Sequence, residues 1–281
     1  MTRLTQPSYW DTKYDNANSP RPTATQRLKT FIRKLLGRQI VAFSRDYSDY
    51  LLWHVFYETQ LPHLQGAKVL EVGSAPGDHL VKFREVLGYE PFGVEYSAPG
   101  AHLNRDLFKH HGLNPDNIIH GDFFSAGFQN QFKDFFDVVV SRGFIEHFTD
   151  PVSVIDAHLN VLRTGGHLVI TIPNLRGVNH VLMAFFYRDV IPMHNLTIMR
   201  YEPFSKLFSR ARISPLLCQY YGTFNFGLFF TDNSLTKRFL LAVGRLLQRL
   251  LNVFLRLAFG TRGPDSRHFS PYLIFIGVKK E

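Results

Sequence analysis

Short apolar runs alternate with amphipathic stretches over residues 67–173 of the chain. Alternation of this kind is typical of an α/β fold built on a parallel sheet. The apolar runs predict strands at 68–72, 91–95, 117–120, 137–141 and 167–172, and the stretches between them predict helices at 78–87, 98–111 and 151–162. The run at 137–140 is apolar on both faces, so we expect a central strand covered by helices on either side.

The β/α rhythm breaks after Pro173. Residues 174–201 mix aromatic, basic and proline residues and predict a lid over the strand ends. A short helix is predicted at 202–208, a sixth strand at 216–221 and a seventh at 272–278. We therefore expect a seven-stranded, mainly parallel sheet with helices on both faces.

A long amphipathic helix is predicted at 234–259, between the last two strands. Its four arginines, Arg238, Arg245, Arg249 and Arg256, fall within roughly 20° of one direction at about 100° per residue. A basic stripe on an apolar helix suits an anionic membrane surface, but it also suits a helix packed on the body or on a second subunit. The stretch 27–38 repeats the pattern near the N-terminus.

Composition says little about where the protein is located and what it binds. The 281 residues are 45% hydrophobic, which is ordinary for one packed α/β domain with insertions. Cys218 is the only cysteine, so we expect no disulfide, no thiolate metal site and a cytoplasmic location. The N-terminus lacks the apolar stretch of a secretory signal. A net charge of +9 favours anionic partners.

The loop at 73–78 follows the first predicted strand and opens a helix, as a nucleotide-binding loop does. A P-loop is excluded because the loop has no Gly-Lys-Ser/Thr sequence. A dinucleotide fingerprint would need glycine at the position of Asp78, whose carboxylate would oppose a diphosphate. The loop therefore favours a ligand with an uncharged or cationic end.

This segment resembles motif I of the class I S-adenosylmethionine-dependent methyltransferases. Glu71, Gly73 and Gly77 match the motif, while Ala75 replaces its middle glycine, which is tolerable if the local φ is negative. The resemblance implies a Rossmann-like fold that binds S-adenosylmethionine through the loop residues Glu71, Gly73, Ser74, Ala75 and Gly77.

Later strand ends continue the resemblance. Glu95, followed by Tyr96, resembles the carboxylate that accepts the two ribose hydroxyls. Asp122 and Phe123 resemble the residues that recognise adenine, and Ser141 with Arg142 opens the segment similar to the fourth-strand motif. Motifs in this order over residues 68–174 imply one nucleoside lying across the carboxyl ends of the strands.

The chemistry expected is displacement of a methyl group from a sulfonium, in which alignment is the enzyme's main task. For a hydroxyl acceptor a general base would help, and His147, which follows the fourth strand, is the first candidate and His194 in the lid segment the second. The alternative is that Glu146-His147 opens the next helix and orders the loop by hydrogen bonding. Tyr14 is expected in an N-terminal segment that folds over the cofactor, although a plain surface helix is the alternative.

The sequence thus predicts residues 1–60 as a helical cofactor cap, 61–222 with 270–281 as the methyltransferase core, and 223–269 as a helical insertion. The expected reaction is O-methylation of a small-molecule, saccharide or lipid-linked acceptor, and the lid and insertion resemble bacterial methyltransferases of glycans or lipid-linked saccharides. Alternatives are an inactive methyltransferase-like scaffold, a membrane-docking module or a nicotinamide-dependent oxidoreductase. Nucleic acid is disfavoured because the basic residues concentrate in amphipathic stretches. A homodimer and a peripheral position at the inner membrane face stay open.

Overall fold

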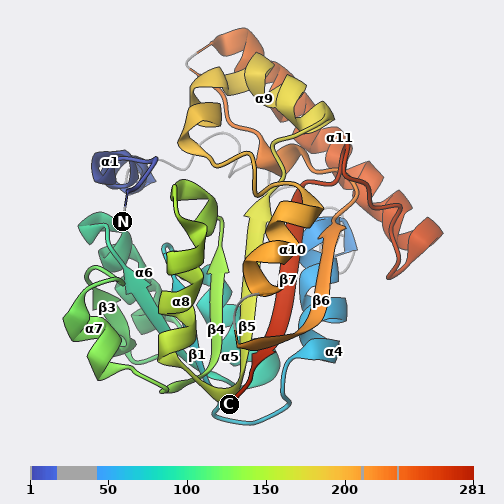
Figure 1. Cartoon of the computed structure of the whole chain (residues 1–281). Helices are drawn as coiled ribbons and strands as arrows, with labels where there is room; N and C mark the ends of the chain where they lie inside the picture. The colour runs from blue at the N-terminus through green and yellow to red at the C-terminus, as the bar shows by residue number, and fades with distance from the viewer. Residues whose placement is uncertain (1, 18–42, 210–211, 233) are drawn as a thin grey trace.

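The computed structural model describes residues 2–17, 43–209, 212–232 and 234–281, and its centre is one seven-stranded sheet (Figure 1). The strand order is β3-β2-β1-β4-β5-β7-β6. The strands are β1 (Lys68–Val72), β2 (Glu90–Glu95), β3 (Ile118–His120), β4 (Phe136–Arg142), β5 (Leu162–Pro173), β6 (Ile213–Tyr221) and β7 (Tyr272–Lys279). The basic stretch predicted at 27–38 lies outside the described residues.

The first five strands are parallel, and β7 runs antiparallel between β5 and β6. This arrangement confirms the predicted mainly parallel sheet. Two strands begin earlier than predicted, β5 at Leu162 and not at 167, and β6 at Ile213 and not at 216. Leu162 pairs with Phe136 before a register shift, and the sequence Gly165-Gly166, which reads as a turn, lies inside the strand.

Helices cover both faces of the sheet. On one face lie α7 (Ala126–Gln131), α8 (Pro151–Val161) and α10 (Tyr201–Ser209); on the other lie α3 (Tyr47–Leu51), the π-helical η1 (Leu52–Tyr57), α4 (Glu58–Gln60), α5 (Asp78–Leu87) and α6 (Ala98–His110) (Figure 1). In β4, Val139 joins the core under α8, while Val138 and Val140 join the core under α5. Apolar side chains on both faces of this strand are therefore buried, as the sequence predicted.

Short helices were the elements that the sequence pattern missed. Helix α7 has only six residues and begins with Ala-Gly, so it carries little periodicity. Within the predicted lid, residues 174–201 form α9 (Val178–Tyr187) and the 3-10 helix η4 (Arg188–Met193). The helices predicted at 78–87, 98–111, 151–162, 202–208 and 234–259 are present within a residue at nearly every end.

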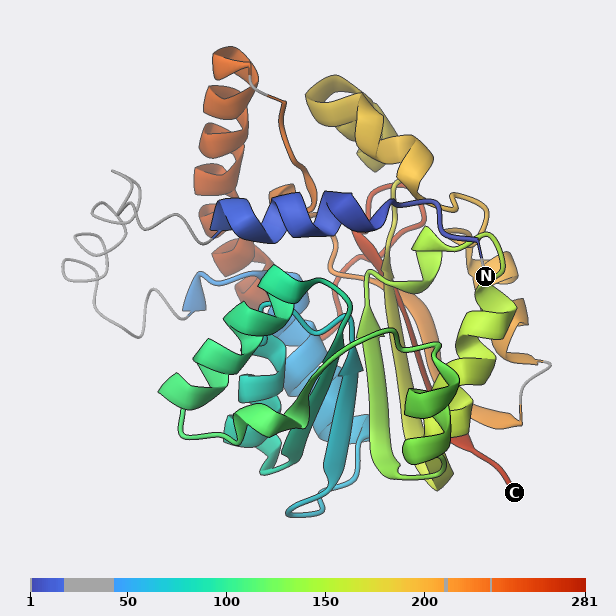
Figure 2. The ribbon, with the colours of Figure 1, turned by 90° about the vertical axis from the view of Figure 1, so that its left-hand side faces the viewer.

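Three elements gather beyond the carboxyl edge of the sheet. Helix α1 (Pro7–Ala17) lies across the strand ends, with α9 and α11 (Leu235–Phe259) further out (Figures 1 and 2). The 3-10 helix η5 (Phe226–Leu228) packs against α11. Among the described helices, none combines the length and hydropathy needed to cross a bilayer. These elements enclose the space above the strand ends.

Candidate active site

A cavity of about 660 Å³ lies at the carboxyl edge of the sheet, a volume suited to a small-molecule site. Its wall combines strand ends with α1, η3 (Ile145–His147), the lid segment and the chain around η5. Most of the predicted site residues line it: Tyr14, Gly73, Ala75, Glu95, Tyr96, Asp122, Phe123, Arg142, His147 and His194. Four predicted residues do not line it: Glu71, Ser74, Gly77 and Ser141.

The loop after β1 has the tight backbone that the sequence predicted. Gly73 has φ +72° and donates its N–H to Val94 O at 2.9 Å. Gly77 has φ +104°, and a Cβ there would lie 2.2 Å from Oδ1 of Asn104. Ala75 is not among the described non-glycine residues with positive φ, so the condition on its conformation is met.

Glu71, Ser74 and Ser141 are buried behind this loop. Oε1 of Glu71 lies 3.0 Å from Nδ1 of His79, and the hydroxyl of Ser74 accepts a hydrogen bond from Nδ2 of Asn104 at 2.8 Å. Glu71 Oε2 and the Ser141 hydroxyl have no hydrogen-bond partner among the described residues. In this structure the three residues support the loop and do not reach the cavity.

Glu95 ends β2 and turns its carboxylate into the wall of the cavity. Oε2 accepts from the N–H of Ala75 at 3.1 Å, and Oε1 accepts from the N–H of Ser97 at 2.9 Å. Burial raises the pKa of this carboxyl, while the backbone N–H groups act in the opposite direction. Each oxygen accepts one of these bonds and keeps capacity for another donor.

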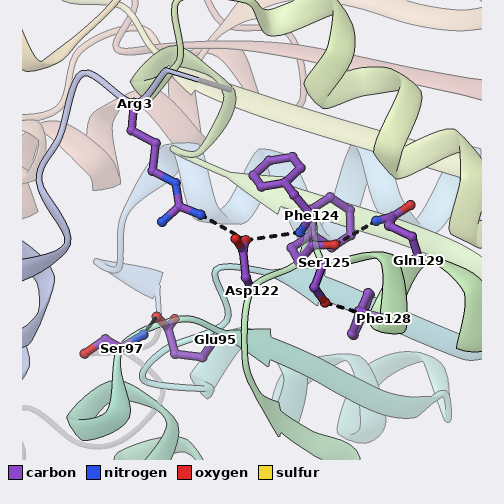
Figure 3. A network of polar contacts seen from close by, with 9 residues as sticks. Arg3, Glu95, Ser97, Asp122, Phe124, Ser125, Phe128 and Gln129 are labelled. Atoms are coloured by element: carbon purple, nitrogen blue, oxygen red, sulfur yellow. Dashed lines mark hydrogen bonds and ion pairs between the residues drawn. The ribbon is translucent and has the colours of Figure 1, made fainter.

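Asp122 is the point where the N-terminus meets the segment after β3. Oδ1 forms an ion pair with Nη2 of Arg3 at 2.9 Å and accepts from the N–H of Phe124 at 3.1 Å (Figure 3). The Arg3 guanidinium also lies 4.5 Å from the centre of the Tyr96 ring. Phe123 lines the cavity but is mostly buried in the core under α8. Sequence reasoning missed Arg3, because nothing local connects it to a residue 119 positions away.

Helix α1 covers the cavity and presents aromatic and basic side chains to it. The Tyr14 hydroxyl donates to Ala75 O at 3.2 Å, and the Ser97 hydroxyl donates to Oδ1 of Asp11 at 2.7 Å. Trp10 lies edge to face with His147, at 5.3 Å between ring centres. Desolvation by burial lowers the pKa of Lys13, although the negative charge of Glu95 acts to raise it. The N-terminal segment therefore lies over the strand ends, where a cap was predicted.

His147 and His194 face each other, with 4.5 Å between ring centres. Nδ1 of His147 contacts Met193 O at 2.9 Å, and Nδ1 of His194 contacts Val190 O at 2.7 Å. Because a carbonyl oxygen only accepts, each Nδ1 is the donor, and each neutral ring keeps its lone pair on Nε2. Burial lowers the pKa of both rings, that of His147 to about 3. Each ring is therefore neutral and fixed in orientation.

His147 also makes contacts that order its surroundings, and its role as a base stays a prediction. Its carbonyl accepts from the N–H of Leu4 at 2.7 Å, and Nδ1 lies 2.7 Å from the Thr5 hydroxyl. The Glu-His pair forms η3 and does not open helix α8, which begins at Pro151. His147 makes these ordering contacts through its backbone and Nδ1, so its Nε2 is left available to a ligand.

Glu146 is the cavity residue that sequence reasoning passed over in favour of its neighbour. Its carboxyl is 1% exposed, and neither oxygen has a hydrogen-bond partner among the described residues. Burial raises its pKa to about 8. Glu146, His147 and His194 could also hold a metal ion, since they offer ligand atoms within 4.8 Å of one another. No local sequence feature shows that this carboxyl lacks a partner.

Arg142 ends β4 and lines the cavity. Protein surrounds its guanidinium, yet the side chain keeps accessible surface because it faces the cavity. Its side chain forms no hydrogen bond or ion pair with any residue that the structure describes, although the charge of the buried Glu71 acts on the guanidinium. An arginine of this kind is suited to a carboxylate or another anionic group of a ligand.

A sequence profile described as a methyltransferase domain matches residues 46–213, which is more than half of the chain. The match contains β1 to β5 and the residues after them that line the cavity. No curated protein matches the sequence.

Solved structures share the fold at low identity. The 4+2 cyclase SpnF is 16% identical with a TM-score of 0.55, over 82% of this chain and 80% of that chain. Phosphoethanolamine N-methyltransferase 2 of Haemonchus contortus, in complex with S-adenosyl-L-methionine, is 16% identical with a TM-score of 0.53. The match covers 83% of this chain and 53% of that chain. Geranyl diphosphate C-methyltransferase of Streptomyces coelicolor A3(2) is 12% identical with a TM-score of 0.52. The match covers 83% of this chain and 78% of that chain. At these identities the likeness shows the fold.

Replacing Glu146 with glutamine should remove a pH-dependent loss of stability. The folded carboxyl holds its proton up to about pH 8, whereas the ordinary value is 4.5, so between these values the folded state binds more protons. Relative to that of Glu146→Gln, the free energy of unfolding of the wild type should therefore fall as pH rises from 5 to 8, by up to about 4 kcal/mol. Urea unfolding across this range measures both.

Glu58→Gln is the matched control, because Glu58 is exposed on α4. Its unfolding free energy should follow that of the wild type at every pH. Parallel pH profiles for Glu146→Gln and the wild type would show that the Glu146 carboxyl is ionised without cost in the folded protein.

Proposed function

The chain belongs to the methyltransferase domain family and is a class I S-adenosylmethionine-dependent methyltransferase, and on this premise we propose that it methylates a hydroxyl oxygen of a small-molecule, saccharide or lipid-linked acceptor. One observation carries the proposal: two neutral histidines face the cavity with their Nε2 lone pairs unused by the backbone. Family membership removes the support for a nicotinamide-dependent oxidoreductase. An inactive scaffold would be favoured by a closed pocket, and the cavity is large.

The residues of the cavity fit S-adenosylmethionine. Glu95 retains acceptor capacity for vicinal ribose hydroxyls, and Arg142 has an unpaired guanidinium for the carboxylate of the methionine part. When bound, S-adenosylmethionine supplies an electrophilic methyl group on a positively charged sulfur. We propose that Asp122 and Phe123 lie beside the adenine, and that residues 1–60 cap the nucleoside through Tyr14.

The histidine pair is suited to removing a proton from an acceptor hydroxyl. The two Nδ1–H groups are held by carbonyl oxygens, so the rings cannot turn without losing those bonds. Glu146 lies next to the pair, with Oε1 3.8 Å from Nε2 of His147. A proton accepted on Nε2 makes an imidazolium, which Glu146 would stabilise only where it is ionised, above about pH 8, so we expect the rate of transfer to rise with pH in this range. His147 and His194 thus act as the proposed base, and Glu146 acts on their charge.

The outer part of the cavity is suited to an amphiphilic acceptor. Its wall there includes Leu175, Met183 and Val190 from the lid segment, and Leu228 and Phe230 from the chain before α11. Apolar side chains bind a hydrocarbon part and exclude water from the reacting atoms. We propose that residues 223–269 serve this end of the site, with residues 61–222 and 270–281 as the catalytic core.

Glu95→Gln should weaken binding of S-adenosylhomocysteine by about 10- to 100-fold, because the amide loses charge-assisted acceptor bonds to the ribose hydroxyls. Isothermal titration calorimetry of the wild type and the variant measures the change. Glu90→Gln, at the start of the same strand and away from the cavity, is the control and should bind as the wild type does. Equal affinity for Glu95→Gln would remove Glu95 from the binding site.

His147→Ala should slow methyl transfer by about 10² to 10⁴ while changing donor affinity little, because it removes a base and not a donor contact. The assay follows label from methyl-tritiated S-adenosylmethionine into a lipid extract and a panel of free and nucleotide-linked sugars, with mass spectrometry to locate the methyl group. His110→Ala, on the exposed end of α6, is the control. EDTA should leave the rate unchanged if the histidines act without a metal.

Label found on nitrogen or carbon would contradict O-methylation. A rate for His147→Ala equal to that of the wild type would contradict its role as a base.

A further inference from the structure

Helix α11 presents a continuous row of large apolar side chains to solvent. Leu235, Phe239, Leu246, Leu250 and Leu257 are 79%, 68%, 59%, 71% and 74% exposed. Their spacing of four and seven residues places them along one side of the helix, and we call this row the outer stripe. An apolar surface of this length on a soluble protein marks an interaction site.

The opposite side of α11 packs on the body and combines polar and apolar residues: Leu241, Gly244, Gln248, Asn252 and Leu255 are buried. Nε2 of Gln248 donates to Phe224 O at 3.0 Å, and Nδ2 of Asn252 donates to Ser44 O at 3.2 Å. At Gly244 a Cβ would lie 2.7 Å from the ring of Phe226, so the helix packs closely there. Two leucines and two amides of α11 therefore face the protein, while most of its large apolar side chains face outward.

The arginines lie along the border between these two sides, about 90° from the outer stripe. Two of them help to hold the helix in place: Nη2 of Arg245 donates to Phe229 O at 2.8 Å, and Arg256 lies 4.3 Å from the centre of the Tyr50 ring. Arg238 is exposed and Arg249 is half-buried. The sequence left open whether α11 faces the body, a partner or a membrane; one side of it packs on the body, and the outer stripe is exposed.

We propose that α11 docks this protein flat on an anionic lipid bilayer, with the outer stripe inserted at the boundary of headgroups and acyl chains and Arg238 and Arg249 on the phosphates. A second copy of the chain suits this surface poorly. Helix α11 carries five basic residues and no acidic one, so two such helices in contact would repel each other. Anionic headgroups complement both the charge and the apolar stripe.

The same face adjoins the cavity. Phe230, 45% exposed, lines the cavity and lies just before α11 in the chain. On the other side of this opening, Val181 and Phe185 of α9 are 67% and 52% exposed, and Nζ of Lys237 lies 5.9 Å from the centre of the Phe185 ring. Figures 1 and 2 show α9 and α11 together beyond the strand ends. A docked protein would receive a lipid-anchored acceptor directly from the bilayer.

Vesicle co-sedimentation tests the docking and does not depend on the methyl-transfer reaction. The full chain should sediment with phosphatidylglycerol-containing vesicles and at least tenfold less with pure phosphatidylcholine vesicles. The double variant Leu246→Glu and Leu250→Glu should reduce the partition coefficient on anionic vesicles at least tenfold. Leu64→Glu with Val86→Glu is the matched control, because both residues are exposed at the opposite edge of the sheet and should leave sedimentation unchanged.

The charge variant Arg238→Glu with Arg249→Glu keeps the test valid if the leucine variant folds poorly. It should lower the partition coefficient about tenfold at low salt and show little defect at high salt, since screening removes the attraction. Calorimetric binding of S-adenosylhomocysteine checks the fold of each variant. Absence of wild-type sedimentation, or sedimentation of both double variants equal to that of the wild type, would overturn the proposal. So would a dimer in sedimentation velocity that Leu246→Glu with Leu250→Glu dissociates without vesicles.

Discussion

Parallel strands with apolar side chains on both faces need cover on both sides, and this constraint decides where the protein can bind anything. In β4, alternate valines belong to different cores, so neither face of the sheet can hold a polar site. The strand ends are the part of the sheet left open, and Glu95, Arg142 and the residues after β3 all lie there. Residues distant in the chain meet at this edge because each follows a strand of the same direction.

The cavity depends on segments that close over this edge from both ends of the chain. The N-terminal residues reach it through the Arg3 ion pair to Asp122 and the contact of Thr5 with His147. The lid segment reaches it through Met193 and Val190, whose carbonyls hold the two histidines. Burial by these covers gives Glu146 its raised pKa and the histidines their lowered ones. The shifted pKa values of Glu146 and the two histidines therefore result from burial under these segments, and not from the sequence motif to which the residues belong.

Local patterns predicted what local forces determine. The apolar run of β4, the glycines of the loop after β1 and the acids at strand ends are visible in a few neighbouring residues, and the sheet and most of the cavity wall follow from them. Contacts across more than a hundred positions, such as Arg3 with Asp122, have no local signal. The same is true of Glu146, whose lack of a partner depends on everything around it. Glu71, Ser74 and Ser141 fit the motifs, yet packing places them behind the wall.

Helix α11 shows why periodicity alone could not settle its role. The spacing of its arginines and leucines predicts an amphipathic helix, but two directions for the apolar side satisfy it equally. Gln248 and Asn252 decide between them, because their hydrogen bonds to Phe224 and Ser44 fix the polar side against the body. Turning the helix over would move these amides to solvent and take their donors away from the carbonyl oxygens of Phe224 and Ser44, at a cost of about 1 to 3 kcal/mol for each carbonyl that stays buried and unsatisfied. The two amides, together with the buried Leu241 and Leu255, therefore set the orientation, and the outer stripe is left exposed.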